Sequence, residues 1–198
     1  QYTGFRLSAL WKPTDELDIT LTYLQQDIDQ DGIPEVDLNS SDDYQQQRIN
    51  IGANRDRNEY LETEIDVTNL MINYDLGWGR ITNTTSWVSY EAVTGAYLVN
   101  NFLAGRPFFY DNLLSVDTFS EELRLVSEFD GDLQFIAGLY YEDSEREWHT
   151  FWDWAADPST LPSPPITVAQ VGPFSKLDDI IPTKQKAFFG EVTYNITD

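Results

Sequence analysis

A group of regularly spaced carboxylates occurs early in the chain, in the segment DIDQDGIPEVD. Its acidic residues occupy positions 1, 3, 5 and 9 of a calcium-loop pattern, and Gly32 at position 6 allows the sharp turn. Position 12, where an EF-hand requires a bidentate glutamate, is Leu38, so the segment is not an EF-hand. The spacing predicts a weak calcium site with candidate ligands Asp27, Asp29, Asp31, Glu35 and Asp37.

The same segment can also be interpreted as an acidic loop that lies in water. The chain has 34 Asp and Glu against 12 Lys and Arg, a net charge of -22, so groups of carboxylates arise easily by chance. The spacing resembles the DxDxDG-type calcium loops of extracellular repeats, in which Glu35 or Asp37 would close the site. Both interpretations stay open, and calcium is the only cofactor that the sequence suggests.

Aromatic residues and the single histidine gather in a second segment, WHTFWDW. Aromatic rings can stack on a sugar, an aromatic siderophore or another flat ligand, or they can extend a β-sheet wall. A lone imidazole without cysteine or a second histidine is a poor transition-metal site, so a structural role is the alternative for the histidine. Ligand contact in a long loop is the hypothesis for Trp148, His149, Phe151, Trp152 and Trp154.

Composition and motifs exclude several classes of function. The chain has no cluster of basic residues to bind phosphates, which argues against a nucleic-acid partner. It has no cysteine, so disulfides, thiolate metal sites and cysteine nucleophiles are absent. No nucleophile–base pair, P-loop or dinucleotide fingerprint occurs, and the sequence therefore does not predict an enzyme. A glycoside hydrolase would need two carboxylates that converge across a cleft, which a sequence does not reveal.

Seven segments alternate between apolar and polar residues with the period of a β-strand. The clearest two flank an acidic turn at 128–132. Phe119, Leu123 and Leu125 fall on one side of the first, and Phe135, Ala137 and Leu139 fall on one side of the second. The pattern predicts an all-β antiparallel meander with strands near 5–11, 17–23, 66–74, 80–90, 119–125, 133–142 and 186–194. Which face each residue of 80–90 occupies stays open.

The connections between these strands alternate between short and long. Short turns are expected at 12–16, 75–79 and 128–132, and long irregular segments at 25–63, 92–117 and 143–183. Loops of this length are uncommon in compact soluble domains, whereas outer-membrane β-barrels combine tight periplasmic turns with long outer loops. No run of about 18 apolar residues occurs, so a transmembrane helix is not expected.

Aromatic residues lie at both ends of the predicted strands, which is typical of the two interfacial girdles of a membrane barrel. Those beside the short turns are Trp11, Tyr74, Trp78, Phe129 and Tyr194. Those near the opposite ends are Tyr23, Tyr90, Phe119, Tyr141 and Phe188. The alternative is a soluble extracellular β-sandwich or solenoid that binds carbohydrate or calcium, in which these residues form the core.

Several of these segments resemble the barrel of TonB-dependent outer-membrane receptors. The run FSEELRLVSEFDGDLQFIAGLYYEDSE is followed, after a long segment, by KQKAFFGEVTYNITD. In that family a strand similar to SQELRL, a Gly/Asp turn, a strand ending in GxYY and a later aaFGxxTYxxTD segment recur in this order. ALWKPTDELDITLTY resembles a hairpin of the same barrels.

The resemblance implies that residues 1–198 are part of a 22-stranded transmembrane β-barrel, without the plug domain or the segment that contacts TonB. Seven strands do not close such a barrel, so an open, curved sheet with two unpaired edges is expected. The implied function is energy-coupled import of a scarce nutrient across the bacterial outer membrane. The implied partners are outer-membrane lipid, the receptor's own plug domain, TonB and a small-molecule ligand, with long loops outside the cell and short turns in the periplasm. The ligand could be ferric siderophore, carbohydrate, cobalamin or another nutrient.

Overall fold

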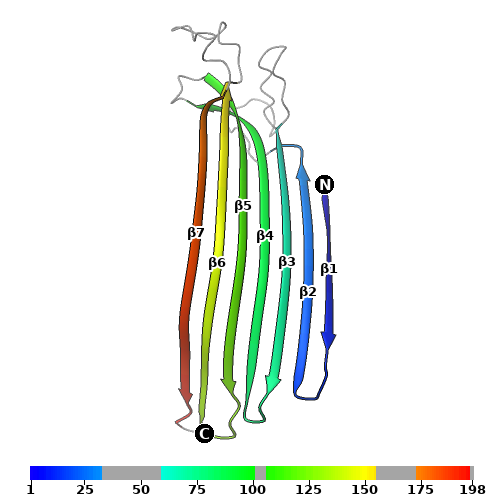
Figure 1. Cartoon of the computed structure of the whole chain (residues 1–198), viewed down its shortest axis with the longest axis vertical. Coiled ribbons are helices and arrows are strands. Elements are labelled where there is room, and N and C mark those ends of the chain that lie inside the picture. The colour runs from blue at the N-terminus through cyan, green and yellow to red at the C-terminus, as the bar shows by residue number, and fades with distance from the viewer. Residues whose placement is uncertain (33–58, 101–105, 155–172, 197–198) are drawn as a thin grey trace.

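The computed structural model describes residues 1–32, 59–100, 106–154 and 173–196. They form one seven-stranded antiparallel sheet in which the strands follow one another in chain order (Figure 1). The strands are β1 (Tyr2–Trp11), β2 (Leu17–Gln30), β3 (Tyr60–Asp75), β4 (Gly79–Asn100), β5 (Arg106–Ser127), β6 (Leu133–Trp154) and β7 (Pro173–Tyr194). The predicted all-β meander of seven strands in one open sheet is therefore confirmed, and β1 and β7 are its two edges.

The strand register places two very different sets of side chains on the two faces of the sheet, because cross-strand partners share a face. One row across all seven strands is Trp11, Ile19, Ile72, Asn83, Leu123, Leu139 and Phe188. A row on the other face is Ser8, Thr22, Asn69, Ser86, Ser120, Glu142 and Gln185. We call these two surfaces the apolar face and the polar face.

The side-chain directions expected for the central hairpin agree with this register. Phe119 and Leu125 lie on the apolar face with Ala137 and Leu139, and Gln134 lies with Glu142 on the polar face. The register also settles the strand at 80–90. Its odd-numbered residues, including Trp87, lie on the apolar face.

The strands are much longer than the sequence predicted. β4, β5, β6 and β7 each have 22 residues, so most of the irregular segments expected at 92–117 and 143–183 is regular strand. Alternation disappears there because both faces of the extended strands carry polar and charged residues, and the apolar period that marks a strand is lost. Backbone pairing continues without it, from Tyr97 with Phe109 to Trp148 with Asp179.

Residues that were expected to break strands are accommodated for local reasons. Gly95 lies within β4, where a Cβ atom would come within 2.3 Å of the Tyr60 ring, so the missing side chain makes room for that ring. Pro182 belongs to β7, which pairs only with β6, and an edge strand tolerates a residue without an N–H. Pro107 is the second residue of β5, and the pairing of β5 with β6 begins only at the next residue, Phe108.

The sheet is a single layer, and its apolar face carries little of a conventional core. Among the described residues, the buried hydrophobic side chains are Ala92, Ala96 and Phe109. Large side chains lie exposed instead, with Leu139 at 55% and Phe188 at 75% of their full accessibility. The described residues contain no helix that is long and apolar enough to cross a membrane.

Candidate membrane-contact surface

The lower part of the apolar face, toward the three short turns in Figure 1, forms an apolar band across the sheet. Its members come from every strand, because each strand contributes alternate residues to this face. The register places Leu21 beside Leu70, Leu123 beside Leu139, and Leu125 beside Ala137. Polar side chains interrupt the band at Asn83, Thr85 and Glu121, where the Asn83 side-chain amide donates to Glu121 at 3.1 Å and Thr85 Oγ1 donates to Asn83 Oδ1 at 3.3 Å. An exposed surface of this extent needs an apolar environment to cover it.

Aromatic residues form a row at each limit of the band. At the limit away from the short turns, Trp87 and Phe119 have ring centroids 5.5 Å apart, and Phe119 and Tyr141 have centroids 6.2 Å apart. At the other limit, Trp78 stacks on Phe129 at 5.7 Å. We call these the upper and lower aromatic rows.

The two rows lack three of the aromatic residues that were expected in them. Tyr90 lies on the polar face, the face that its cross-strand partners Ile65 and Val116 also occupy. It therefore does not belong to the upper row. Phe188 and Trp11 share a row with Leu123 and Leu139, which places both in the middle of the band. Trp87, whose register was open, belongs to the upper row.

The polar face of the same strands carries a network of short hydroxyl and amide side chains. Ser8 and Thr22 share a hydrogen bond of 3.0 Å, Asn69 donates to Ser86 at 2.8 Å, and Thr118 and Ser144 share one of 2.8 Å. These pairs join strands that are neighbours in the sheet. Hydroxyl and amide side chains can also hydrogen-bond to water, so this face is compatible with water, in contrast to the band behind it.

Above the upper aromatic row, the apolar face changes character and becomes acidic. The first row above it contains Asp66, Asp117 and Glu145, and the second contains Asp27, Glu64, Glu91 and Glu147. Desolvation and the charges of Asp27 and Asp66 raise the pKa of Glu64, as expected for crowded carboxylates. The sheet therefore has an apolar zone and a strongly anionic zone on one face, separated by aromatic rings.

Part of the predicted calcium site lies in this acidic zone. Asp27 and Asp29 belong to β2, and Asp31 follows that strand; Glu35 and Asp37 lie outside the described residues. Asp27 and Asp29 project from the same face, where their cross-strand partners are Glu64 and Glu62. Within the described ranges, no group of three or more His, Asp or Glu side chains is placed to hold a metal ion.

The aromatic segment around His149 lies in β6 and not in a loop. The strand directs Trp148 and Trp152 to the polar face and His149 and Phe151 to the apolar face. Trp154 is the last residue of β6 and pairs with Phe108. The expected location in a long loop is therefore wrong, because the segment is part of β6 and its successive residues alternate between the two faces. Ligand contact by these residues stays a prediction.

His149 is the centre of an ionic cluster that joins β6 to β7. Its Nδ1 atom lies 2.8 Å from Asp178, and its Nε2 atom lies 3.4 Å from Glu147. Lys176 also contacts Asp178 at 2.6 Å and lies over the Phe151 ring, 5.3 Å from its centroid. The hydrogen bonds to Asp178 and then Glu147 raise the pKa of His149, against a smaller lowering by desolvation.

The His149 cluster should stabilise the upper end of the β6–β7 pair in a pH-dependent way. Because the folded-state pKa is raised, the contribution is complete below the unfolded value of about 6.5 and is lost as pH rises through the folded value. His149 is the only histidine of the chain, so its imidazole can be titrated by NMR without ambiguity. We expect a folded pKa above about 6.5 that falls in Asp178→Asn. A wild-type pKa at or below that value would contradict the cluster.

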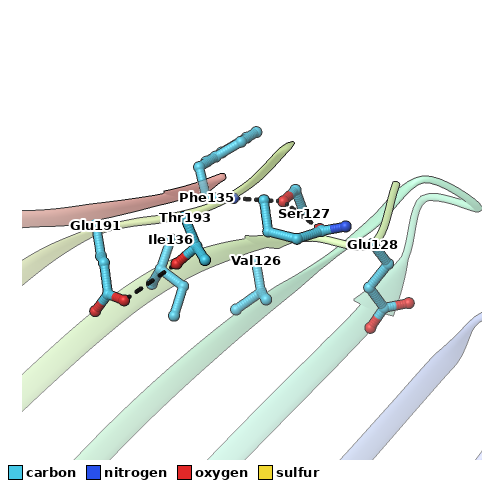
Figure 2. Close-up of a pocket in the computed structure, with 8 residues that line it drawn as sticks. Val126, Ser127, Glu128, Phe135, Ile136, Glu191 and Thr193 are labelled. Atoms are coloured by element: carbon cyan, nitrogen blue, oxygen red, sulfur yellow. Dashed lines mark hydrogen bonds between the residues drawn. The ribbon is translucent and has the colours of Figure 1, made fainter. Parts of the chain in front are cut away.

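A hollow of about 400 Å³ on the polar face lies beside the β5–β6 turn (Figure 2). The Gln134 side chain accepts from Ser127 Oγ at 2.9 Å and donates to the Phe129 carbonyl at 2.7 Å. The Phe135 backbone N–H donates to Ser127 Oγ at 2.7 Å. These hydrogen bonds all remain within the β5–β6 hairpin and help to close its turn, while Thr193 on β7 donates to Glu191 at 3.3 Å in the same hollow (Figure 2).

Sequence reasoning found the apolar band but not the acidic zone or the His149 cluster. Lys176 and Asp178 lie in a segment that was interpreted as a loop, and Asp117 and Glu145 lie beyond the predicted strand ends. The available signal was the charge pattern itself, since Glu145 and Glu147 alternate with Arg146.

Comparison with models of protein families, with curated proteins and with solved structures finds no match to this chain.

Proposed function

We propose that this chain forms part of the wall of an outer-membrane β-barrel of the TonB-dependent receptor type. The observation that supports it best is the apolar band on one face of a single-layer sheet, bounded by two aromatic rows and backed by a polar face. A soluble sheet with this face would require a second layer to cover it. In a bilayer, the lipid chains cover it.

The height of the band supports a membrane. Trp78 and Trp87 mark its two limits and are nine residues apart, which corresponds to about 30 Å of extended strand. With strands tilted by about 40° to the membrane normal, this becomes roughly 23 Å, close to the apolar band of about 25 Å in known barrels. The strand beyond Trp87 then extends above the membrane.

The two faces of the sheet support one orientation of the proposed barrel. The band faces lipid, and the hydroxyl and amide side chains of the polar face line a water-filled interior. The short turns lie on the periplasmic side, and the long β4–β7 extensions lie outside the cell. Further strands of the barrel pair with β1 and β7, whose outer backbone groups would otherwise remain free.

The resemblance of the strand motifs supports the more specific assignment to TonB-dependent uptake. In this proposal the chain acts with a plug domain and with TonB, both outside residues 1–198, and binds and passes a scarce nutrient without breaking bonds. A siderophore complex, a carbohydrate or another small molecule is the proposed class of ligand. Calcium bound near Asp27 and Asp29 remains a separate proposal.

Site-directed spin labelling tests the proposed orientation residue by residue. Residues 1–198 contain no cysteine, and single cysteines are introduced in a background without other cysteines, at Leu123 and Leu139 on the apolar face and at Thr84 and Ser120 on the polar face. The full-length protein is reconstituted in lipid, and collisions with oxygen and with a water-soluble nickel chelate are measured. We expect labels at Leu123 and Leu139 to meet oxygen but not nickel, and labels at Thr84 and Ser120 to meet nickel.

The outcome separates the proposal from the main alternative. In a soluble β-sandwich, Leu123 and Leu139 would lie in a packed core and be protected from both reagents. Nickel collisions at these two positions equal to those at Ser120 would contradict a membrane-facing surface. Uptake of the nutrient by cells that depend on the full-length protein, with and without TonB, then tests the transport function itself.

A further inference from the structure

A groove of about 680 Å³ lies on the apolar face where the band meets the acidic zone. Its lower side consists of the aromatic residues of the upper row, and its upper side consists of carboxylates. Its walls include Trp87, Phe119, Tyr141, Asp66, Asp117 and Glu145. No Lys or Arg belongs to the described lining of the groove.

Two carboxylates of the groove face each other, and no Lys, Arg or His among the described residues forms an ion pair with either of them. Asp117 on β5 and Glu145 on β6 are direct cross-strand partners, and both side chains are exposed. Like charges in this position destabilise a sheet. A cation bound between them would relieve this repulsion.

The aromatic row supplies the second element of cation recognition. Trp87 is 47% exposed, and its ring lies beside Phe119 with a tilt of 50° between the two planes. Exposed aromatic faces attract ammonium groups through the ring quadrupole, and aromatic residues beside carboxylates recognise quaternary ammonium ligands. The groove therefore combines the two chemistries that an ammonium group uses.

The chain itself places ammonium groups at the β7 side of this groove. Lys184 Nζ lies 2.8 Å from Asp143 Oδ2, and Lys186 Nζ lies 5.8 Å from the centroid of the Tyr141 ring. Both lysines come from the edge strand β7 and contact residues that line the groove. On the other side of the groove, toward β3 and β5, no lysine in the described part of the chain contacts Asp117 or Trp87.

We propose that this groove binds the ammonium head group of a cationic amphiphile in the membrane. The head group lies between Asp117, Glu145 and the Trp87 ring, and the alkyl chain follows the apolar band toward Leu123 and Leu139. This inference rests on the proposed membrane location of the band, because only that location brings an amphiphile to the groove. The site lies on the outer surface of the wall, separate from the interior through which a nutrient would pass.

Association of spin-labelled lipids with the full-length protein in neutral bilayers tests the proposal. In bilayers of an uncharged glycolipid, a lipid with a trimethylammonium head group is compared with a diacylglycerol that has the same labelled chains and no ammonium group. We expect the ammonium lipid to associate about fivefold more strongly, since an exposed cation–π contact and a surface ion pair each contribute a few-fold. The double variant Asp117→Asn/Glu145→Gln and the variant Trp87→Leu should each lose most of this preference.

A matched control separates the groove from the general negative charge of the face. Glu62→Gln/Glu91→Gln removes the same number of charges from the same face, outside the described groove, and should retain the preference. Equal loss in this control, or no preference in the wild type, would overturn the proposal. Tetramethylammonium should not compete at concentrations similar to those of the lipid, and equal competition would also overturn binding of an amphiphile. Failure of the membrane proposal is recognised separately, from the spin-label accessibility of Leu123 and Leu139.

Discussion

Leu139→Arg should destabilise the full-length protein in lipid by about 2–4 kcal/mol, the cost of a cationic side chain near the middle of a barrel's lipid-facing band. Leu139 is half exposed on the apolar face, beside Leu123 and Phe188, and lies two residues below Tyr141 of the upper aromatic row. An arginine in this position has no acidic partner in its own row. Denaturant unfolding in lipid vesicles, followed by tryptophan fluorescence, measures the loss.

Thr84→Arg is the matched control for this prediction. Thr84 lies in the same part of the sheet but on the polar face, where its cross-strand partner is Glu122. The new guanidinium would meet water and a carboxylate, so the free energy of unfolding should change by less than about 1 kcal/mol. A loss at Thr84 as large as that at Leu139 would show that the two faces do not differ in environment.

Leu139→Trp distinguishes a lipid-facing position from a position in a packed core, because both environments would reject arginine. Lipid chains accommodate a larger apolar side chain without strain. A close-packed core does not, and overpacking there costs roughly 1–3 kcal/mol. We expect the free energy of unfolding of Leu139→Trp to lie within about 0.5 kcal/mol of the wild-type value, the usual range for a tolerated surface change. Marked destabilisation would favour the soluble sandwich.

The part of the fold that could be predicted from the sequence is the part where the two faces differ in polarity. Between the aromatic rows, period-two alternation identified all seven strands and correctly assigned residues such as Phe119 and Leu139 to one face. Beyond those rows, Glu145 and Arg146 point to opposite faces but are equally polar. No hydrophobic period exists there, so the strands extend without a signal that local sequence can supply.

The candidate surfaces were predictable to different degrees for a related reason. The apolar band is encoded by residues close in sequence, and its outline was therefore visible at Leu133–Tyr141. The groove and the His149 cluster depend on residues brought together by register, such as His149 with Asp178 and Asp117 with Glu145. These partners are about 28 residues apart in the sequence, and the alternation of apolar and polar residues does not by itself define which residues pair across two strands.

Gly138 provides the clearest test of the register between β6 and β7. Its cross-strand partner on the polar face is Phe189, and a Cβ atom at Gly138 would come within 2.2 Å of that ring. The ring therefore lies over the glycine and covers backbone that has no side chain of its own. This arrangement stabilises glycine in a strand and helps to fix register.

Gly138→Val should destabilise the protein by about 1–3 kcal/mol, because the Phe189 ring has to leave its position. Valine is otherwise a favourable strand residue, so a loss of stability cannot come from strand propensity. Phe189→Ala removes the obstacle, and the double variant Gly138→Val/Phe189→Ala should unfold at lower cost than the sum of the two single variants. A double-mutant cycle measured by denaturant unfolding gives this coupling directly. Strict additivity would mean that the ring does not lie over Gly138, and that the pairing of β6 with β7 differs from the register that also joins His149 to Asp178.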